Sequence, residues 1–347
     1  MISAINESGE EIIFPDNFGG YKYKSTIGKG SIGVVALVVH ERTNREYACK
    51  IVSRSGLIKS DEFNRFEQEL RIQQSLSHNN ILRVIEVIYE EDLIFVVTEY
   101  CSYGDLLSFM SRYSRASQLS NSMICYQILE GINYMHNRGF SHGDIKPDNI
   151  LVDSNFVIKI ADFGCAESSN FHKQPGLKGT LYYVAPEILN GTVVDRQKSD
   201  IWAIGIVLFS IYSSVLPWQG HNDDAIRQEI MESSIKFPLS MPPEIIEVVN
   251  MCCKSNPKLR VSAKDLIQLP FLRVDTKKLR EIKRLPGSTS NSSINANSSS
   301  FNKSSLIIRP NVTKVSKPKS FTPSAGMIQS TKSININRSP MTKEFPI

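Results

Sequence analysis

The order of two hydrophobic patterns along the chain constrains the fold most strongly. Early in the chain, apolar residues form short β-branched runs joined by turns, such as Val34–His40 and Glu46–Val52, and these predict antiparallel strands. Within this part, Asp61–Leu76 places its apolar side chains on one helical face instead. After Gly104 helical periodicity dominates, as in Lys198–Val215. This order predicts an α+β chain in which a small antiparallel β lobe with one helix precedes a larger, mainly helical lobe.

The remaining periodic segments extend both patterns, and the ends of the chain differ from them. Further strands are expected at Val84–Tyr89 and Leu93–Thr98, and further helices at Asp105–Arg115, Leu119–Arg138, Ala225–Glu232, Pro243–Cys253 and Ser262–Gln268. Residues 1–20 are expected to form a short N-terminal leader, and residues 273–285 a basic helical extension. Residues 286–347 are rich in Ser, Asn and Lys and too poor in apolar residues to offset the entropy of ordering, so disorder is predicted there.

Charge and cysteine content exclude several classes of function. The formal net charge is +5, but residues 286–347 hold eight basic residues and one acidic residue, so the preceding part is slightly acidic. That part gives no general case for binding nucleic acid. The six cysteines lack metal-site spacing and indicate reduced thiols in a cytoplasmic protein, with nuclear entry left open. Neither a signal peptide nor a membrane-spanning stretch is apparent, so no membrane partner is expected.

A glycine-rich segment, Gly28-Lys29-Gly30-Ser31-Ile32-Gly33, indicates phosphate binding. A plain tight turn and a dinucleotide-binding fold are the alternatives, and the latter requires a following helix and an acidic residue about 20 positions further on. Here residues 34–39 predict a strand, and the residue 20 positions after Gly30 is Lys50. A glycine hairpin over phosphates, with a lysine on the next strand, fits both observations. Glycine suits such a hairpin because backbone amides can approach phosphate oxygens without interference from Cβ atoms.

A polar loop later in the chain holds the groups that phosphoryl transfer to a hydroxyl requires. Asp144 can orient the hydroxyl and accept its proton, and Lys146 can neutralise charge on the moving phosphoryl group. Asn149 can bind magnesium. An ordinary polar turn is the alternative interpretation. Asp162, which follows a predicted strand at residues 157–160, adds a second oxygen ligand of the kind magnesium prefers.

Together these motifs resemble the eukaryotic protein kinase family over residues 21–272. The family's motifs occur in order as the Gly28–Gly33 loop, Ala48-Cys49-Lys50, the Phe140–Asn149 loop, Asp162-Phe163-Gly164 and Ala185-Pro186-Glu187. The resemblance implies a bilobal protein-kinase fold, with an N-lobe and hinge at residues 21–101 and a C-lobe at residues 102–272. It also implies that ATP and Mg²⁺ bind between the lobes and that phosphate is transferred to protein substrates.

By this resemblance the nucleotide site draws on both lobes. Lys50 is expected to hold the α- and β-phosphates and to pair with Glu69, or alternatively with Glu67. Thr98 resembles the gatekeeper before the adenine-binding hinge. The full set implied for ATP comprises Ile27, Gly28, Lys29, Gly30, Ser31, Ile32, Gly33, Val34, Val35, Ala48, Lys50, Glu69, Glu99, Cys101, Asp105 and Leu151. In this set Glu99 and Cys101 form the hinge, Asp105 lies near the ribose, and Val35, Ala48 and Leu151 enclose the adenine.

Further motifs resemble one branch of the family. Lys146, two residues after Asp144, and Thr180 in the segment before Ala185-Pro186-Glu187 resemble the serine/threonine branch, in which Thr180 would bind both other side chains. Leu216-Pro217-Trp218, together with Asn256-Pro257 and Arg260, resembles the calcium/calmodulin-dependent and AMP-activated-like group. In that comparison Arg260 would be the partner of Glu187.

Four positions depart from the family pattern. Gly143 stands where most relatives carry an arginine, and Gly176 stands where the phosphorylated residue of the activation segment usually lies. Because both halves of that switch are missing, we expect activity without activation-segment phosphorylation. Ile32 occupies a position where an aromatic residue is common. Gln73 replaces an aliphatic residue four positions after Glu69, which would loosen this helix or shift the assignment of the glutamate.

The sequence also bears on the partners of the protein. Asp105 and Asp148 match acidic positions that select an arginine in basophilic relatives, and solvated surface acids are the alternative. Residues 273–285 fit a calmodulin-binding segment less well than a solvated final helix. The chain is expected to be a monomer. Two other classes of function stay open, a pseudokinase acting as a binding module and an interaction protein acting through its basic tail.

Overall fold

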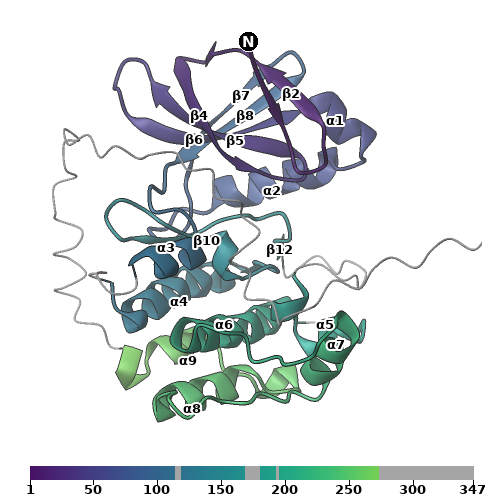
Figure 1. The fold of residues 1–347 in the computed structure, drawn as a ribbon, viewed down its shortest axis with the longest axis vertical. Helices are drawn as coiled ribbons and strands as arrows, with labels where there is room; N and C mark the ends of the chain where they lie inside the picture. Colours follow the sequence, from purple (N-terminus) through teal and green to yellow (C-terminus); the bar gives the residue numbers. More distant parts are fainter. Residues whose placement is uncertain (114–118, 169–179, 193–194, 273–347) are drawn as a thin grey trace, which may run out of the picture. The chain divides into compact units, whose positions relative to one another are not determined.

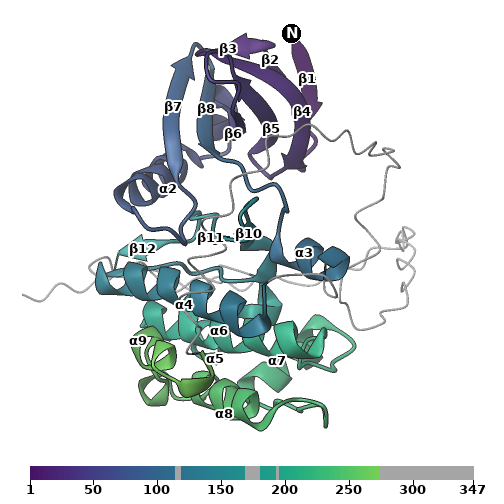
Figure 2. The same cartoon turned by 90° about the vertical axis from the view of Figure 1, so that its left-hand side faces the viewer.

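The computed structural model describes residues 1–113, 119–168, 180–192 and 195–272. Its N-terminal part is a six-stranded antiparallel sheet in the order β3-β4-β5-β6-β8-β7 (Figures 1 and 2). The strands are β3 (Asn17–Phe18), β4 (Tyr21–Lys29), β5 (Gly33–His40), β6 (Glu46–Ser53), β7 (Val84–Glu90) and β8 (Leu93–Glu99). Their β-branched and aromatic composition suits a pleated, buried surface. The four strand segments that the sequence predicts fall within these elements.

Two helices follow strand β6 and lie beside the sheet. Helix α2 (Phe63–Ser75) buries Phe66 and Leu70 in one apolar cluster with residues from β6 and β8. It corresponds to the helix predicted at Asp61–Leu76. Helix α1 (Arg54–Lys59) was not predicted; the Ser53 side chain caps it by accepting a hydrogen bond from the Gly56 amide at 3.0 Å.

Residues 1–20, expected to be only a leader, fold onto the sheet. Strands β1 (Ile2–Ile5) and β2 (Glu11–Phe14) pair as an antiparallel hairpin, which we call the N-terminal hairpin. Alternate residues of β2, Ile12 and Phe14, are buried in the same cluster as the apolar side chains of β4, β5, β6 and β8. The hairpin is therefore part of the N-lobe core.

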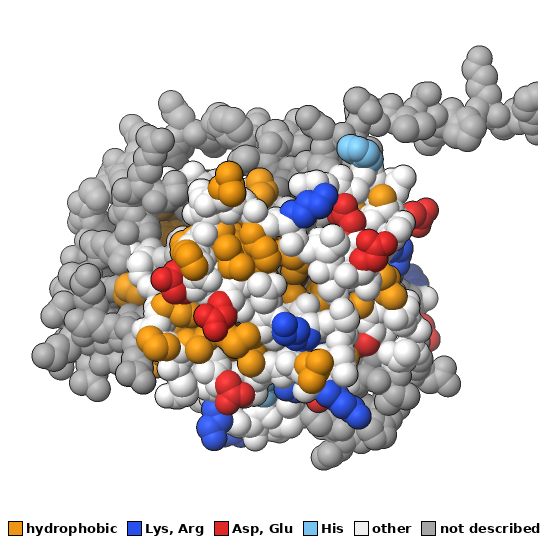
Figure 3. Space-filling model, turned by 90° about the horizontal axis from the view of Figure 1, so that it is seen from below, with side chains coloured by type: hydrophobic (Ala, Val, Ile, Leu, Met, Phe, Trp, Pro, Cys, Tyr) orange, Lys and Arg blue, Asp and Glu red, His pale blue; other side chains and the backbone are white. Residues whose placement is uncertain are grey.

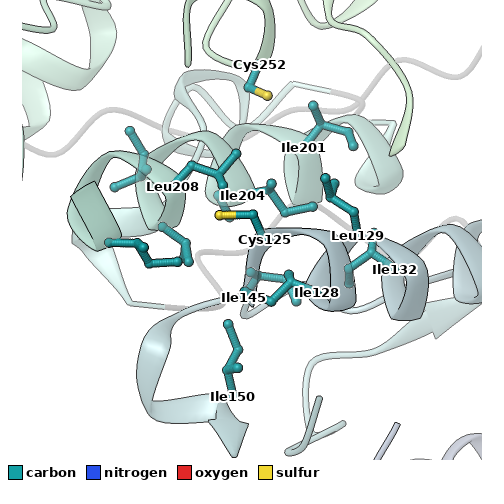
Figure 4. Close-up of a cluster of buried hydrophobic side chains, with 14 of the residues drawn as sticks. Cys125, Ile128, Leu129, Ile132, Ile145, Ile150, Ile201, Ile204, Leu208 and Cys252 are labelled. Atoms are coloured by element: carbon teal, nitrogen blue, oxygen red, sulfur yellow. The ribbon is translucent and has the colours of Figure 1, made fainter. Parts of the chain in front are cut away.

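The C-terminal part is mainly helical and surrounds a buried helix, α6 (Arg196–Ser213) (Figure 1). The other helices are α3 (Leu106–Tyr113), α4 (Asn121–Asn137), α5 (Pro186–Leu189), α7 (Asp223–Met231), α8 (Pro243–Cys252) and α9 (Ala263–Ile267). Short 3-10 turns lie at Pro147–Asn149, Leu181–Tyr183, Pro257–Leu259 and Pro270–Leu272. Short strands β9 (Phe140–Ser141), β10 (Ile150–Val152), β11 (Ile158–Ile160) and β12 (Glu167–Ser168) form two small antiparallel sheets, in which β10 pairs with β11 and β9 with β12. Ile128 and Leu129 of α4 belong to the same cluster of buried side chains as Ile204 and Leu208 of α6 (Figure 4).

Specific contacts join the two lobes around the hinge. The Leu82 amide donates to the Ile160 carbonyl at 2.8 Å, and the Ile160 amide donates to the Asn80 carbonyl at 2.9 Å. Lys159 and Glu99 form an ion pair at 2.9 Å across the same junction. The predicted α+β, bilobal protein-kinase fold is confirmed.

The surface of the C-lobe mixes all kinds of side chain. Seen from below, acidic, basic and apolar groups are interspersed over this face (Figure 3). Among the described residues, no helix is long and apolar enough to cross a membrane.

Candidate active site

The loop between β9 and the turn at Pro147–Asn149 is held from below by the buried Asp200 of α6. Its carboxylate accepts the amide hydrogens of His142 and Gly143, each at 2.8 Å. The His142 ring donates from Nε2 to the Ala161 carbonyl at 3.0 Å and accepts the Asp144 amide at Nδ1 (3.3 Å), which fixes its tautomer. These buried bonds set the backbone from which the Asp144 side chain projects.

Four predicted site residues converge at the end of this loop. Lys146 Nζ donates to Asp144 Oδ2 at 2.7 Å and to Thr180 Oγ1 at 2.8 Å. The Thr180 amide donates to Asp144 Oδ1 at 3.1 Å, and Asn149 Nδ2 donates to Asp144 Oδ2 at 3.0 Å. Donors therefore hold both oxygens of Asp144, so its carboxylate has a defined orientation. The structure brings together Asp144, Lys146, Thr180 and Asn149 as the sequence predicts.

Lys50 lies on β6 opposite Val35 of β5, so the sheet places it below the glycine-rich loop. Its Nζ atom is 3.1 Å from Glu69 Oε1 on α2. Glu67, the alternative partner, instead forms a pair with Arg71 on the exposed side of the same helix. The structure thus places Glu69 rather than Glu67 beside Lys50.

The side chain of Gln73 has a hydrogen-bond partner, and Glu69 keeps its place beside Lys50, so the glutamate assignment is not shifted. The expected loosening of α2 stays a prediction. The Gln73 side chain is buried, and Nε2 donates to the Leu82 carbonyl at 3.0 Å, next to the hinge. A buried amide that is hydrogen-bonded costs little, whereas an unpaired one would be destabilising. Gln73 therefore ties α2 to the segment before β7, and Glu69 stays in register with Lys50.

The Asp162-Phe163-Gly164 segment connects both lobes. Asp162 adopts a left-handed backbone conformation with φ of +64°, and its side chain is exposed, while Phe163 is buried beside the His142 ring. Arg65 of α2 donates from Nε to the Gly164 carbonyl at 3.0 Å. Sequence reasoning missed Arg65, because nothing in the local pattern separates it from an ordinary exposed helix residue.

Asn149 and Asp162 are the residues available to hold magnesium. Asn149 is buried and uses its amide nitrogen toward Asp144, which leaves its amide oxygen as a possible ligand. Within the described residues no group of three or more His, Cys, Asp or Glu side chains is arranged to hold a metal. This donor set fits magnesium, which is commonly bound by one or two protein oxygens together with substrate phosphates and water.

The hinge residues lie at the junction of the lobes. Both carboxylate oxygens of Glu99 are engaged, by the Arg83 amide at 2.8 Å and by Lys159 at 2.9 Å. Burial raises the pKa of the Cys101 thiol to about 12, so this side chain is an uncharged apolar group at the hinge. Leu151 packs with Cys101 in a small apolar cluster on the C-lobe side.

The other predicted nucleotide contacts differ in their exposure. Val35 and Ala48 are half-buried, and Ile27 is 40% exposed at the end of β4. The Val34 side chain, in contrast, is buried in the N-lobe core, because successive residues of a strand face opposite sides. Asp105 caps α3, with both of its oxygens accepting hydrogen bonds from Ser108 at 2.8 Å. The predicted ribose contact of Asp105 would have to share a carboxylate already engaged in this cap.

Gly143 has a backbone that few other residues tolerate. Its φ is +80°, and a Cβ atom built there would lie 2.6 Å from the Cys165 carbonyl oxygen.

Near this loop, Glu167 of β12 is buried and pairs with Arg196 at the start of α6, with an N–O distance of 3.6 Å. This pair was also missed by sequence reasoning, because it joins two segments that only the tertiary fold brings together. Gly176 lies outside the described residues.

A buried ion pair closes the lower part of the site. Arg260 binds Glu187 with two bonds of 2.6 and 2.7 Å, and donates further to the carbonyls of Lys254 and Lys198. Its guanidinium also lies over the Trp202 ring. The partnership of Arg260 and Glu187 that the resemblance implies is present in the structure.

Comparison with known proteins finds protein kinases among the relatives of this chain. Serine/threonine-protein kinase SIK1 of Mus musculus is 29% identical over 272 residues, which cover 77% of this chain and 34% of the relative. Maternal embryonic leucine zipper kinase of Xenopus tropicalis is 29% identical over 256 residues, which cover 73% of this chain and 39% of the relative. The chain thus spans little more than a third of the length of these curated relatives. These relatives confirm the predicted resemblance to the calcium/calmodulin-dependent and AMP-activated-like group.

A family model described as Protein kinase domain matches residues 21–272, which are most of the chain. The matched segment contains the glycine-rich loop, the Lys50–Glu69 pair, the cluster around Asp144 and the Asp162-Phe163-Gly164 segment described above. The chain belongs to the protein kinase family.

Proposed function

We propose that the protein is an ATP-dependent serine/threonine kinase that transfers the γ-phosphate of ATP to hydroxyl groups of protein substrates. The observation that carries this proposal is the cluster in which Lys146, Thr180 and Asn149 surround the Asp144 carboxylate. The names of the relatives, one of them a serine/threonine-protein kinase, support the same activity. A pseudokinase is disfavoured because Lys50, Asp144, Asn149 and Asp162 are all present.

Each side chain has a defined task in this reaction. Asp144 orients the acceptor hydroxyl and accepts its proton as the oxygen attacks the γ-phosphorus. Lys146 neutralises negative charge on the phosphoryl group during transfer. Lys50, fixed by Glu69, positions the α- and β-phosphates. Magnesium, held by Asn149 and Asp162, would screen the charge of the triphosphate.

A peptide-library assay with radiolabelled MgATP tests this activity. A wild-type kcat of roughly 1–100 s⁻¹ is typical of such kinases. Lys50→Met and Asp162→Asn should each abolish nearly all transfer while leaving the melting temperature within a few degrees. Undiminished turnover by either variant would show that the assignment is wrong.

We also propose that activity does not require phosphorylation of the activation segment. Gly143 offers no cation to a phosphate, and its backbone leaves little room for a side chain. The Glu167–Arg196 pair supplies a permanent contact between β12 and α6. Phosphatase treatment of the purified kinase should leave its activity unchanged. A collapse of activity would refute this proposal and would make Ser168, Ser169 and Tyr182 the candidate phosphorylation sites.

Two acidic side chains, Asp105 and Asp148, are the candidates for binding an arginine upstream of the acceptor hydroxyl. Of the two candidate acids, Asp148 is exposed, whereas Asp105 is engaged in its helix cap. We therefore assign any preference for an upstream arginine to Asp148, and Asp148→Asn should weaken that preference in a peptide array. The predicted monomeric state and cytoplasmic location remain predictions. The proposed calmodulin-binding segment and the tail lie outside the described residues.

A further inference from the structure

The turn of the N-terminal hairpin contacts the tip of the glycine-rich loop. The Glu7 amide donates to the Gly30 carbonyl at 3.0 Å, and Ser8 Oγ donates to the Ser31 carbonyl at 2.7 Å. Residues 1–20 precede the segment that matches the family model, so the hairpin is an addition to the shared domain. These bonds link the addition directly to the predicted phosphate-binding loop.

The hairpin is firmly anchored, so it can fix the position of the loop. Phe14 is fully buried, and Ile12 is nearly so, in the apolar cluster that they share with residues of β4, β5, β6 and β8. The turn itself is closed by Asn6, which is buried and whose Oδ1 atom accepts the Glu10 amide at 2.9 Å. The contacts to the loop therefore start from a rigid element rather than from a free chain end.

The geometry of the peptide bond determines what these contacts do. In a trans peptide the C=O and N–H groups point in opposite directions. Bonds from the hairpin to the carbonyls of Gly30 and Ser31 thus turn the amides of Ser31 and Ile32 away from the hairpin. Within the described part of the chain, neither of these two amides donates a hydrogen bond. Unpaired amides in such a loop are suitable donors to phosphate oxygens.

We propose that Glu7 and Ser8 are positioning residues of the nucleotide site, which hold the glycine-rich loop with two amides ready for the phosphates of ATP. This inference rests on the proposed kinase function. Glycine-rich segments lose much conformational entropy when they are ordered. A loop ordered in advance by the hairpin avoids part of that cost when ATP binds, and so binds ATP more tightly.

The test compares two serines of the same hairpin in the full-length protein. Ser8→Ala removes the hydroxyl that donates to the glycine-rich loop. Ser3→Ala removes a hydrogen bond to Glu11, which lies within the hairpin and does not involve the glycine-rich loop. Loss of one hydrogen bond predicts a KM for ATP about threefold to tenfold higher in Ser8→Ala. The KM for peptide and the melting temperature should stay at wild-type values, as should every parameter of Ser3→Ala. Ser8→Thr, which keeps a hydroxyl, should restore the KM for ATP.

Hydrogen–deuterium exchange provides a second measurement that does not depend on turnover. Without nucleotide, two hydrogen-bonded amides at this contact, that of Glu7, which donates to Gly30, and that of Gly30, which donates to Gly33, should exchange faster in Ser8→Ala than in Ser3→Ala. If the wild type turns over ATP but Ser8→Ala changes neither the KM for ATP nor the exchange rates, the positioning role of the hairpin is refuted and the proposed kinase function stands. Equal effects of both alanine substitutions would also overturn it, since they would reflect general loosening of the hairpin. A wild type that binds no MgATP would overturn the proposed function as well.

Discussion

Replacing Gly143 by alanine tests how tightly the catalytic loop is constrained. Two costs are expected in the free energy of folding. The left-handed backbone at φ of +80° disfavours any residue with a Cβ atom, by about 1–2 kcal/mol. The new Cβ atom would also lie 2.6 Å from the Cys165 carbonyl oxygen, and relief of such overpacking typically costs about 1–3 kcal/mol.

Gly139, the residue immediately before β9, provides a matched control. Its φ is +76°, but a Cβ atom there would meet nothing within 4 Å. Gly139→Ala should therefore carry only the backbone cost, and Gly143→Ala should be less stable than this control by about 1–3 kcal/mol. In a domain of this size, each kcal/mol lowers the melting temperature by about 2–4 °C.

Denaturant unfolding and steady-state kinetics measure the two consequences. Relief of the clash must move the backbone whose amide binds Asp200, and Asp144 follows directly. A displacement of this kind predicts a kcat about 10- to 100-fold below wild type for Gly143→Ala, with little change for Gly139→Ala. Equal stability and equal kcat for the two variants would refute this account of the loop.

Three further predictions concern other parts of the site. Glu69→Gln should lower kcat/KM at least about tenfold, because Lys50 loses its ionic partner, while Glu67→Gln on the exposed face of the same helix should change it less than about twofold. Arg260→Leu should cost about 3–5 kcal/mol in urea unfolding, because it leaves the buried carboxylate of Glu187 without its cation; a loss under about 1 kcal/mol would contradict that burial argument. The raised pKa of Cys101 predicts that its thiol resists iodoacetamide at pH 8 in the folded protein, whereas peptide mapping that finds rapid alkylation would show an open hinge.

Long periodic segments and catalytic motifs were predictable because their signals are local. Most of helix α6 is a nearly continuous run of apolar residues. The roles of Asp144, Lys146 and Asn149 follow from residue types that stand a few positions apart in one loop. Helix α1 was missed because six residues carry too little periodicity. Its first turn also depends on the Asp92 carboxylate, which accepts the Ser55 amide at 2.7 Å. Asp92 lies in the turn between β7 and β8, far away in the sequence, so no local pattern reveals it.

The N-terminal strands were missed for a related reason. The alternation of β2 spans only four residues, and its meaning depends on the apolar surface of the sheet that it covers. The pairs Arg65 with Gly164 and Glu167 with Arg196 likewise join residues whose neighbourhood is created by the fold. Sequence motifs identify the groups that carry chemistry, whereas the contacts that position those groups follow from tertiary packing.

The most direct test of the central claim is transfer of radiolabelled phosphate from MgATP to a peptide library, followed by phosphoamino-acid analysis, with wild type and Asp144→Asn compared. The account predicts phosphoserine and phosphothreonine from the wild type, and a rate at least about 100-fold lower from the variant at an unchanged melting temperature. Equal incorporation by both proteins, or none by the wild type, would contradict it.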